Sequence, residues 1–354
     1  MRHKIHPQQI SLFDSRENRD LIERERITVT PGHAYDDIIS VENLLSAWRE
    51  FLRGKRRRKD VAVFSLNLTG NILALHRELA DKTYRHGPYH AFKINDPKPR
   101  DIHKAEVRDR LVHHAIYRIL YPYFDRTFVF DSYSCRLDKG TYRAMNRFRQ
   151  YAGIVSRNHT RTVWVLKGDI RKFFASIDHE VLKNILNRRI EDSDTLWLLG
   201  EIIDSFSAKG RSGVGLPLGN LTSQLLANIY MNELDQFMKR KLKIRYCIRY
   251  ADDFIIVHED RRYLESILPA ISTFLNVRLK LSLHPNKVFV KTFASGVDFL
   301  GWVHFPHHRT LRSATKRRVF KRLAANPSDE TRASYRGLLG HGNAHKLAKK
   351  LFVG

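Results

Sequence analysis

Two short apolar runs, residues 244–250 and 254–258, are separated by the tripeptide Ala-Asp-Asp at residues 251–253. This pattern predicts two antiparallel strands joined by a tight turn with carboxylates at its tip. A third carboxylate, Asp169, ends the β-branched and aromatic run TVWVLKGD, which predicts a buried strand. Carboxylates at the ends of neighbouring strands are costly to bury unless cations neutralise them. The sequence therefore predicts an antiparallel sheet with an acidic, cation-binding end.

Asp169, Asp252 and Asp253 are the residues that we expect to bind metal and to be catalytic. Mg²⁺ prefers a few carboxylates together with substrate phosphate oxygens. Two such ions would activate an attacking hydroxyl and stabilise a leaving pyrophosphate. Two Mg²⁺ ions are thus the expected cofactor, and Mn²⁺ suits the same ligands. By itself, a Tyr-X-Asp-Asp tetrapeptide fits a solvated hairpin equally well, so the neighbouring segments decide between the two interpretations.

The charge of the chain indicates a polyanionic partner. Among 354 residues, 63 Lys and Arg face 37 Asp and Glu, a formal net charge of +26. Such an excess is typical of proteins that bind nucleic acid, although charge alone does not separate an enzyme from an architectural protein. Hydrophobic residues make up 42% of the chain, which excludes a wholly disordered protein.

Cysteine usage and hydropathy indicate the compartment. The two cysteines form no CxxC pattern, which argues against a disulfide scaffold and a cysteine-based zinc site. No run of about 18 apolar residues occurs, so we expect no spanning helix and no membrane partner. The first residues contain no stretch apolar enough for a signal peptide. We therefore expect a cytoplasmic protein.

Hydrophobic periodicity predicts a mixture of helices and strands rather than a regular alternation of the two. Helices are expected at residues 37–52, 71–82, 105–121, 178–186, 222–241 and 262–276. Residues 87–99 should be extended, and strands are expected at 288–292 and 297–305. Residues 306–354 carry twelve Lys and Arg against two acids, with helices expected in ATKRRVFKRLAA and ETRASYRGLLG. The layout is α+β.

Several segments, in their order along the chain, resemble the motifs of a known family. KGDIRKFFASID, LPLGNLTSQLLANIYMNELD, RYADDFIIV, LSLHPNKVFV and VDFLGWVHF resemble motifs A to E of the polymerase palm in reverse transcriptases. Upstream, KPRDIHKAEVRDRLVHHAIY and SYSCRLDKGTYRAM resemble two fingers motifs of bacterial and group II intron-like reverse transcriptases. The resemblance implies an RNA-directed DNA polymerase, a nucleotidyltransferase with a right-handed polymerase fold of fingers, palm with an antiparallel sheet, and a short helical thumb.

The resemblance also implies a division of the chain. Residues 1–36 would be a polar N-terminal arm, and residues 37–161 the N-terminal helices and fingers. Residues 162–305 would form the palm, interrupted by a fingers segment at about 180–215. Residues 306–354 would be a basic, helical thumb.

The segment LGNLTSQ departs from the commonest form of motif B. Leu218 stands before Gly219 where most reverse transcriptases have glutamine, and Gln224 stands where they have proline. This form is similar to the reverse transcriptases of diversity-generating retroelements, which copy a template RNA and misincorporate opposite adenines. HGPYHAFKINDPKPR and FPHHRTLR resemble that group as well. Leucine offers only apolar contact where glutamine can hydrogen-bond, so fidelity is expected to fall.

Further roles follow from the resemblance, residue by residue. The nucleotide-binding residues would be Lys98, Arg100, Phe174, Leu218, Gly219, Gln224 and Lys287. Lys98 and Arg100 would grip the triphosphate, with Lys287 close to it, and Phe174 would exclude a ribose 2′-hydroxyl. Phe299, Leu300 and Gly301 would form the primer grip. The alternatives are a basic surface loop for Lys98 and Arg100, a core aromatic for Phe174, and a strand entering the core for the last three.

The implied partners are template RNA, the RNA/DNA hybrid, deoxynucleoside triphosphates and a small basic accessory protein. One alternative keeps the chemistry but assigns it to a retron or an antiphage-defence system. A second is a catalytically silent RNA-binding relative, which the intact Asp169, Asp252 and Asp253 disfavour. An RNA-dependent RNA polymerase fits less well, because Phe174 occupies the position that selects the sugar.

Overall fold

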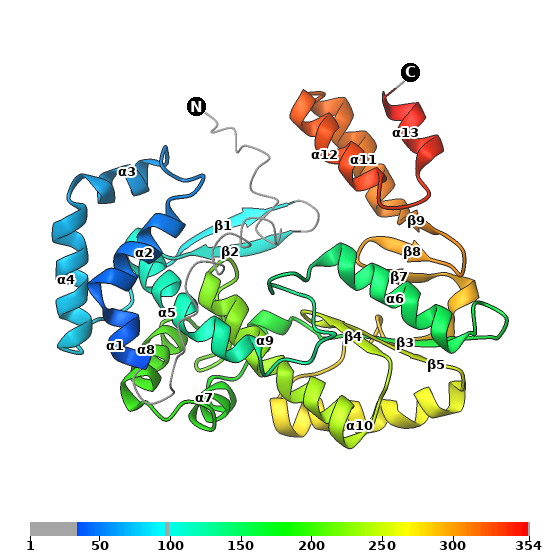
Figure 1. Ribbon diagram of the computed structural model, residues 1–354, viewed down its shortest axis with the longest axis horizontal. Coiled ribbons are helices and arrows are strands. Elements are labelled where there is room, and N and C mark those ends of the chain that lie inside the picture. Colours follow the sequence, from blue (N-terminus) through cyan, green and yellow to red (C-terminus); the bar gives the residue numbers. More distant parts are fainter. Residues whose placement is uncertain (1–33, 96–98, 353–354) are drawn as a thin grey trace.

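The structure, a computed structural model, describes residues 34–95 and 99–352 (Figure 1). Most of the predicted N-terminal arm therefore lies outside the described residues, as does Lys98. The chain begins with four helices, α1 (Ala34–Ile39), α2 (Val41–Phe51), α3 (Lys59–Leu66) and α4 (Leu68–Ala80). Helices α1, α2 and α3 pack against α5 (Val107–Asp125), and α4 packs against those three. The hairpin of β1 (His90–Ile94) and β2 (Arg100–Lys104) lies beside them.

Two details of this region differ from the sequence prediction. The single helix expected at 37–52 is divided at Ser40, whose side chain accepts a hydrogen bond from Asn43 N and so caps α2. Helix α3 was not predicted at all. Only Val61 of α3 is buried, while Val63 and Leu66 are 60% and 89% exposed, so the helix has no apolar face for periodicity to detect.

The central sheet has the strand order β4-β5-β3-β6 and is antiparallel throughout. Its strands are β3 (Trp164–Asp169), β4 (Cys247–Tyr250), β5 (Asp253–His258) and β6 (Phe289–Thr292). The predicted hairpin of β4 and β5 is confirmed, and so is the buried strand that ends at Asp169. Both have β-branched and aromatic residues buried on the two faces of the sheet.

Helices cover both faces of this sheet (Figure 1). Val165 and Ile255 belong to the core under α6 (Thr141–Val155). Their neighbours along the strands, Leu166 and Ile256, belong to the larger core that includes α9 (Leu221–Gln236) and α10 (Arg261–Leu279). Since strand side chains alternate between faces, the two cores lie on opposite sides. A π-helical turn, Phe237–Lys241, extends α9, so the helix predicted at 222–241 is confirmed.

The remaining helices of this half link β3 to α9. A short 3₁₀ helix, Phe173–Ser176, follows β3 and leads into α7 (His179–Asn187) and α8 (Ser193–Asp204). Asp178 accepts a hydrogen bond from Val181 N, which makes it the predicted N-cap of α7.

The C-terminal part has a small antiparallel sheet and three helices. The sheet is formed by β7 (Val297–Phe299), β8 (Trp302–His304) and β9 (Arg309–Leu311). The single strand predicted at 297–305 is therefore wrong, because the chain reverses between β7 and β8. Helices α11 (Ser313–Ala325), α12 (Asp329–Leu339) and α13 (His345–Phe352) follow, one more than the sequence suggested. A core of Met145, Trp302, Leu311, Leu339 and Ala344 joins them to α6.

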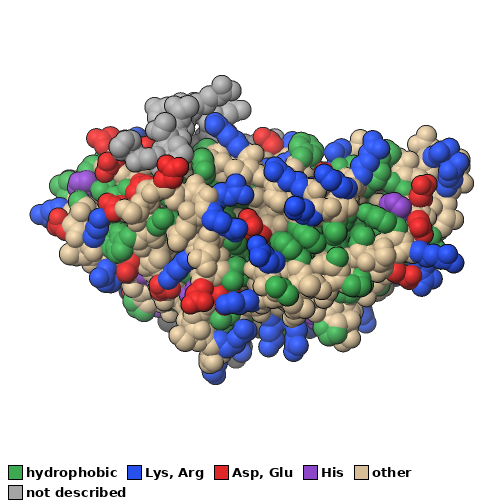
Figure 2. All heavy atoms as spheres, turned by 90° about the horizontal axis from the view of Figure 1, so that it is seen from below, with side chains coloured by type: hydrophobic (Ala, Val, Ile, Leu, Met, Phe, Trp, Pro, Cys, Tyr) green, Lys and Arg blue, Asp and Glu red, His purple; other side chains and the backbone are tan. Residues whose placement is uncertain are grey.

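The excess positive charge is spread over the surface of the protein. Figure 2 shows the face below the sheet, where Lys and Arg side chains predominate over acidic ones between apolar patches. The basic surplus therefore extends beyond the C-terminal helices. No helix among the described residues is long and apolar enough to cross a membrane.

Candidate active site

The three predicted carboxylates lie at one end of the central sheet. Asp169, the last residue of β3, is paired in register with Asp253, the first residue of β5. Asp252 precedes it in the turn, and its carbonyl accepts a hydrogen bond from Ile170 N at 3.2 Å. The structure thus brings together residues that are more than eighty positions apart in the sequence.

A buried ion pair supports the turn that carries Asp252 and Asp253. Ala251 has a φ of 53°, a left-handed conformation that is unusual for a residue with a side chain. Its carbonyl accepts a hydrogen bond from Arg249 Nη1 at 2.9 Å. Arg249 is in turn bound to Asp235 of α9, at 2.6 Å between Nη2 and Oδ2. Sequence reasoning missed both residues, although an arginine inside an apolar strand was a signal for them.

Close packing beside the carboxylates requires a glycine. Gly168 faces Phe254 across β3 and β5, and a Cβ placed on Gly168 would lie 2.2 Å from the Phe254 ring. A real Cβ atom never approaches a ring so closely. The pair is adjacent to Asp169 and Asp253, so glycine lets a large aromatic side chain support the acidic end of the sheet.

Two lysines contact the carboxylates. Lys287, which was predicted, places Nζ 2.7 Å from Asp169 Oδ1. Lys167, which was not predicted, places Nζ 3.1 Å from Asp253 Oδ2 and donates a hydrogen bond to the carbonyl of Asp298 at 2.8 Å. The missed signal was a lysine two residues before Asp169 in a strand, where the side chain points to the same face as the aspartate.

Burial raises the proton affinity of Asp252 and Asp253. Desolvation raises the pKa of Asp253 to about 7, although Lys167 opposes the shift. Desolvation also raises the pKa of Asp252, with a further contribution from the negative charge of Asp169. Lys287 and Arg100 act in the opposite direction on Asp252, which shows that both cations lie within electrostatic range of it. Crowded carboxylates of this kind favour a bound cation.

The donor set fits a divalent metal ion. Asp253 Oδ1 is buried and has no hydrogen-bond partner, so one carboxylate oxygen remains available as a ligand. All the candidate ligands are carboxylate oxygens, which are the ligands that Mg²⁺ prefers. The described residues contain no cluster of three or more His, Cys, Asp or Glu side chains that would enclose a metal on their own. Mg²⁺ usually retains several waters and binds substrate phosphates, so few protein ligands suffice.

The loop that contains Leu218 and Gly219 pairs with strand β2. His103 N donates a hydrogen bond to Leu218 O at 3.0 Å, and Asn220 Nδ2 donates one to His103 O at 2.8 Å. Gly219 has a φ of 114°, and a Cβ there would lie 2.7 Å from Cγ2 of Ile102. A glycine is therefore needed both for the backbone conformation and for the close approach. Asn220 was not predicted.

The backbone of Phe174 binds the segment that leads into this loop. It lies half-buried in the 3₁₀ helix after β3, and its carbonyl accepts a hydrogen bond from Leu216 N at 2.8 Å. Gln224 is half-buried in the first turn of α9, just beyond the loop. Arg100 is exposed at the start of β2.

Phe299, Leu300 and Gly301 form the turn of the β7–β8 hairpin. Leu300 and Gly301 have φ values of 53° and 85°, as a two-residue hairpin turn of the primed type requires. Phe299 is buried, and Gly301 O accepts a hydrogen bond from Arg312 N at 3.2 Å. Lys167 connects this hairpin to the acidic end of the sheet, because it contacts both Asp253 and the backbone of the residue before Phe299.

The sequence of this chain is similar to those of known proteins. The model of a family described as "Reverse transcriptase (RNA-dependent DNA polymerase)" matches residues 93–304. Protein YkfC of Escherichia coli (strain K12) is 26% identical over 303 residues, covering 73% of this chain and 76% of YkfC. The group II intron-encoded protein LtrA of Lactococcus lactis subsp. cremoris is 24% identical, covering 69% of this chain and 51% of LtrA. The chain thus spans about three quarters of one relative and half of the other.

Among solved structures, a telomerase from Candida albicans in complex with a fragment of telomeric RNA has a TM-score of 0.48 and 13% sequence identity. The similarity covers 65% of this chain and 46% of that chain.

Proposed function

This chain belongs to the reverse transcriptase family of RNA-directed DNA polymerases, and we propose that it makes cDNA from the template RNA of a diversity-generating retroelement. Its helices and antiparallel sheet form a right-handed polymerase fold, as the sequence predicted. One observation supports the proposed chemistry: Asp169 and Asp253 are paired in register across β3 and β5, with Asp252 in the adjoining turn. The substrates would be deoxynucleoside triphosphates and a primer on template RNA.

Asp169, Asp252 and Asp253 would hold two divalent metal ions. When bound, these ions supply activation of the attacking hydroxyl and stabilisation of the leaving pyrophosphate. The side chains of the protein would position the substrates and supply positive charge. Lys287 and Arg100 lie within range of the carboxylates and would attract the triphosphate, while Lys167 holds Asp253 against the β7–β8 hairpin. That hairpin would position the primer end.

Phe174 and the loop at Leu218 would shape the site for the incoming nucleotide. The hydrogen bonds of His103, Asn220 and Leu216 tie this loop to β2 and to the backbone of Phe174. An aromatic side chain at Phe174 would leave no space for a ribose 2′-hydroxyl. Leu218 would contact the nascent base pair without hydrogen bonds, which lowers the cost of a wrong pair.

The assignment to a retroelement rests on the segment LGNLTSQ. An apolar residue at Leu218 supports errors opposite template adenines, and these errors are the purpose of such an element. A small basic accessory protein would then help the polymerase to hold its template. Retron and antiphage-defence enzymes share the chemistry but have no need for adenine-directed errors.

Primer extension on template RNA tests the polymerase activity. Asp252→Asn removes one charged ligand with little change in volume, and extension should fall by at least about a thousandfold because the metal site is lost. Asp81→Asn is the matched control, since Asp81 is exposed at the end of α4 and far from the site in sequence. Undiminished extension by the Asp252→Asn variant would refute the assignment of the site.

Sequencing of the cDNA tests the retroelement. Wild-type cDNA should contain more errors opposite adenine than opposite the other three bases, which serve as internal controls. Leu218→Gln should reduce the adenine errors selectively. Equal error rates at all four bases would favour a retron or a defence enzyme. Adding the accessory protein should lengthen the cDNA.

A further inference from the structure

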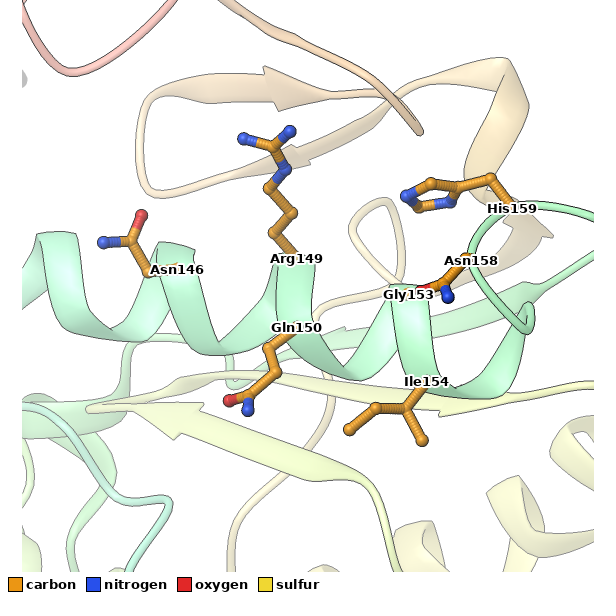
Figure 3. A pocket seen from close by; sticks show the side chains of 7 residues that line it. All are labelled: Asn146, Arg149, Gln150, Gly153, Ile154, Asn158 and His159. Carbon is orange, nitrogen blue, oxygen red and sulfur yellow. The ribbon is translucent and has the colours of Figure 1, made fainter.

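A cavity lies along the outer side of α6, away from the acidic end of the sheet. It has a volume of about 460 Å³ and is lined by Asn146, Arg149, Gln150, Asn158 and His159, with apolar contact from Ile154. Figure 3 shows Arg149 extending from one side of α6, with the imidazole of His159 extending towards it, whereas Gln150 and Ile154 extend from the other side of the helix. None of the residues that line the cavity is acidic.

The positive charge at this cavity is uncompensated. Arg149 is exposed and has no hydrogen-bond or ion-pair partner among the residues described. Arg309 of β9 donates hydrogen bonds to Asn146 Oδ1, on the cavity wall, at 3.0 Å and to the carbonyl of His341. Burial lowers the pKa of Arg309, and the charge of Arg149 lowers it further. Two arginines that repel each other in this way form a site that favours an anion.

Two histidines extend the cluster. The ring centroids of His159 and His307 are 5.0 Å apart. Burial lowers the pKa of His159, and the proximity of His307 and Arg149 lowers it further. Imidazole nitrogens and the amide of Asn158 are hydrogen-bonding groups that suit phosphate oxygens beside an arginine.

The cavity is distant from the site of polymerisation. Thr141, at the start of α6, bonds the hydroxyl of Tyr250 beside the acidic turn, at 3.2 Å. Gly153, at the cavity, is twelve residues further along the helix, or about 18 Å at 1.5 Å per residue. At ~3.4 Å per nucleotide step, about five nucleotides would span that distance.

We infer that this cavity binds a backbone phosphate of the template RNA or its hybrid, several nucleotides from the site of synthesis. The inference rests on the proposed function, since it takes nucleic acid as the ligand. Arg149 and Arg309 supply charge that a phosphate neutralises, and the cavity offers room for a phosphate with its sugar. The contact holds the nucleic acid without reading its sequence.

Equilibrium binding tests the inference without any catalysis. Fluorescence anisotropy with labelled single-stranded RNA and with a labelled RNA/DNA hybrid, at several salt concentrations and without nucleotides, gives affinity and salt dependence. Arg149→Gln should weaken binding about three- to tenfold and reduce the slope of log K against log salt by about 0.7 to 0.9, the value of one phosphate contact. A change on the single-stranded probe alone identifies unpaired RNA as the ligand, and a change on the hybrid alone identifies the duplex.

Arg278→Gln is the matched control. Arg278 is also exposed and carries the same charge, but it lies on α10, which covers the opposite face of the sheet. His159→Asn is a second variant, because asparagine tolerates the positive φ of 69° at this position. Equal salt slopes for Arg149→Gln and Arg278→Gln would overturn the inference. Binding that changes as expected while wild-type extension fails would instead overturn the polymerase assignment alone.

Discussion

Arg249 and Asp235 form a buried ion pair behind the acidic turn, with side chains only 1% and 2% exposed. Arg249 Nε contacts both carboxylate oxygens, at 2.8 and 2.9 Å, and Nη2 adds a third contact at 2.6 Å. The same guanidinium binds the carbonyl of Ala251. One arginine thus connects the long helix α9 to the turn that carries Asp252 and Asp253.

Removing the acidic partner should be strongly destabilising. Asp235→Ala leaves the charge of Arg249 buried and unpaired, which should lower the free energy of unfolding by about 3–5 kcal/mol. Urea denaturation measures the change. Glu265→Ala is the control, because it breaks an exposed pair with Arg261 and should cost less than about 1 kcal/mol. Equal losses in the two variants would contradict a special role for the buried pair.

Gly168→Ala should be destabilising because of one neighbour. Its Cβ would overlap the Phe254 ring, and overpacking of this kind costs about 1–3 kcal/mol or more. The double variant Gly168→Ala with Phe254→Leu should recover part of that loss, since the smaller side chain leaves space. Thermal melts of the wild type, the two single variants and the double variant complete a double-mutant cycle, which gives the interaction energy of the two side chains. Strictly additive losses would show that the two side chains do not compete for space.

Phe174→Val should relax sugar selection. A smaller side chain would leave space for a 2′-hydroxyl, and we expect the preference for deoxynucleotides over ribonucleotides to fall at least about tenfold. Single-nucleotide extension with each triphosphate gives the ratio of kcat/KM values. Phe130→Val, at an exposed phenylalanine, should leave the ratio unchanged. Unaltered selection in the Phe174 variant would favour a purely structural role in the core.

His304 should contribute to acid denaturation. Burial lowers its pKa from 6.5 to about 4, so the unfolded chain binds more protons than the folded chain between these two pH values. The contribution of His304 to the free energy of unfolding is therefore fully present above about pH 6.5. It is lost as the pH falls towards 4, by about 3 kcal/mol. His304→Phe should reduce that pH dependence in urea titrations, whereas His90→Phe, at an exposed side chain, should not. If the stability of the His304→Phe variant depended on pH as that of the wild type does, a lowered pKa at His304 would be contradicted.

The acidic end of the sheet could be predicted because its signal is local. Asp169, Asp252 and Asp253 each follow or interrupt a short apolar strand, and strand ends at one edge of a sheet are neighbours. The same reasoning predicted the long helix after Gly219 and the cap at Asp178.

The contacts of Lys167 and Arg249 could not be predicted, because a charged residue inside an apolar strand signals a buried partner without indicating which residue that partner is. Lys167 binds the backbone at Asp298, and Arg249 binds a residue on another element. Helix α3 buries only Val61, and Gly301 is a weak signal of the β7–β8 reversal because the leucine before it disfavours the positive φ that it adopts there. Tertiary packing decided all four cases.

The pairing of β3 with β5 also limits how this gene can change. Every residue from Trp164 to Asp169 has a fixed partner between His258 and Asp253. Because side chains alternate between the faces of a strand, inserting or deleting one codon in either segment would turn its apolar residues to the wrong face and displace its aspartate. Point substitutions among apolar residues should therefore accumulate here in related genes, whereas changes of length should be eliminated.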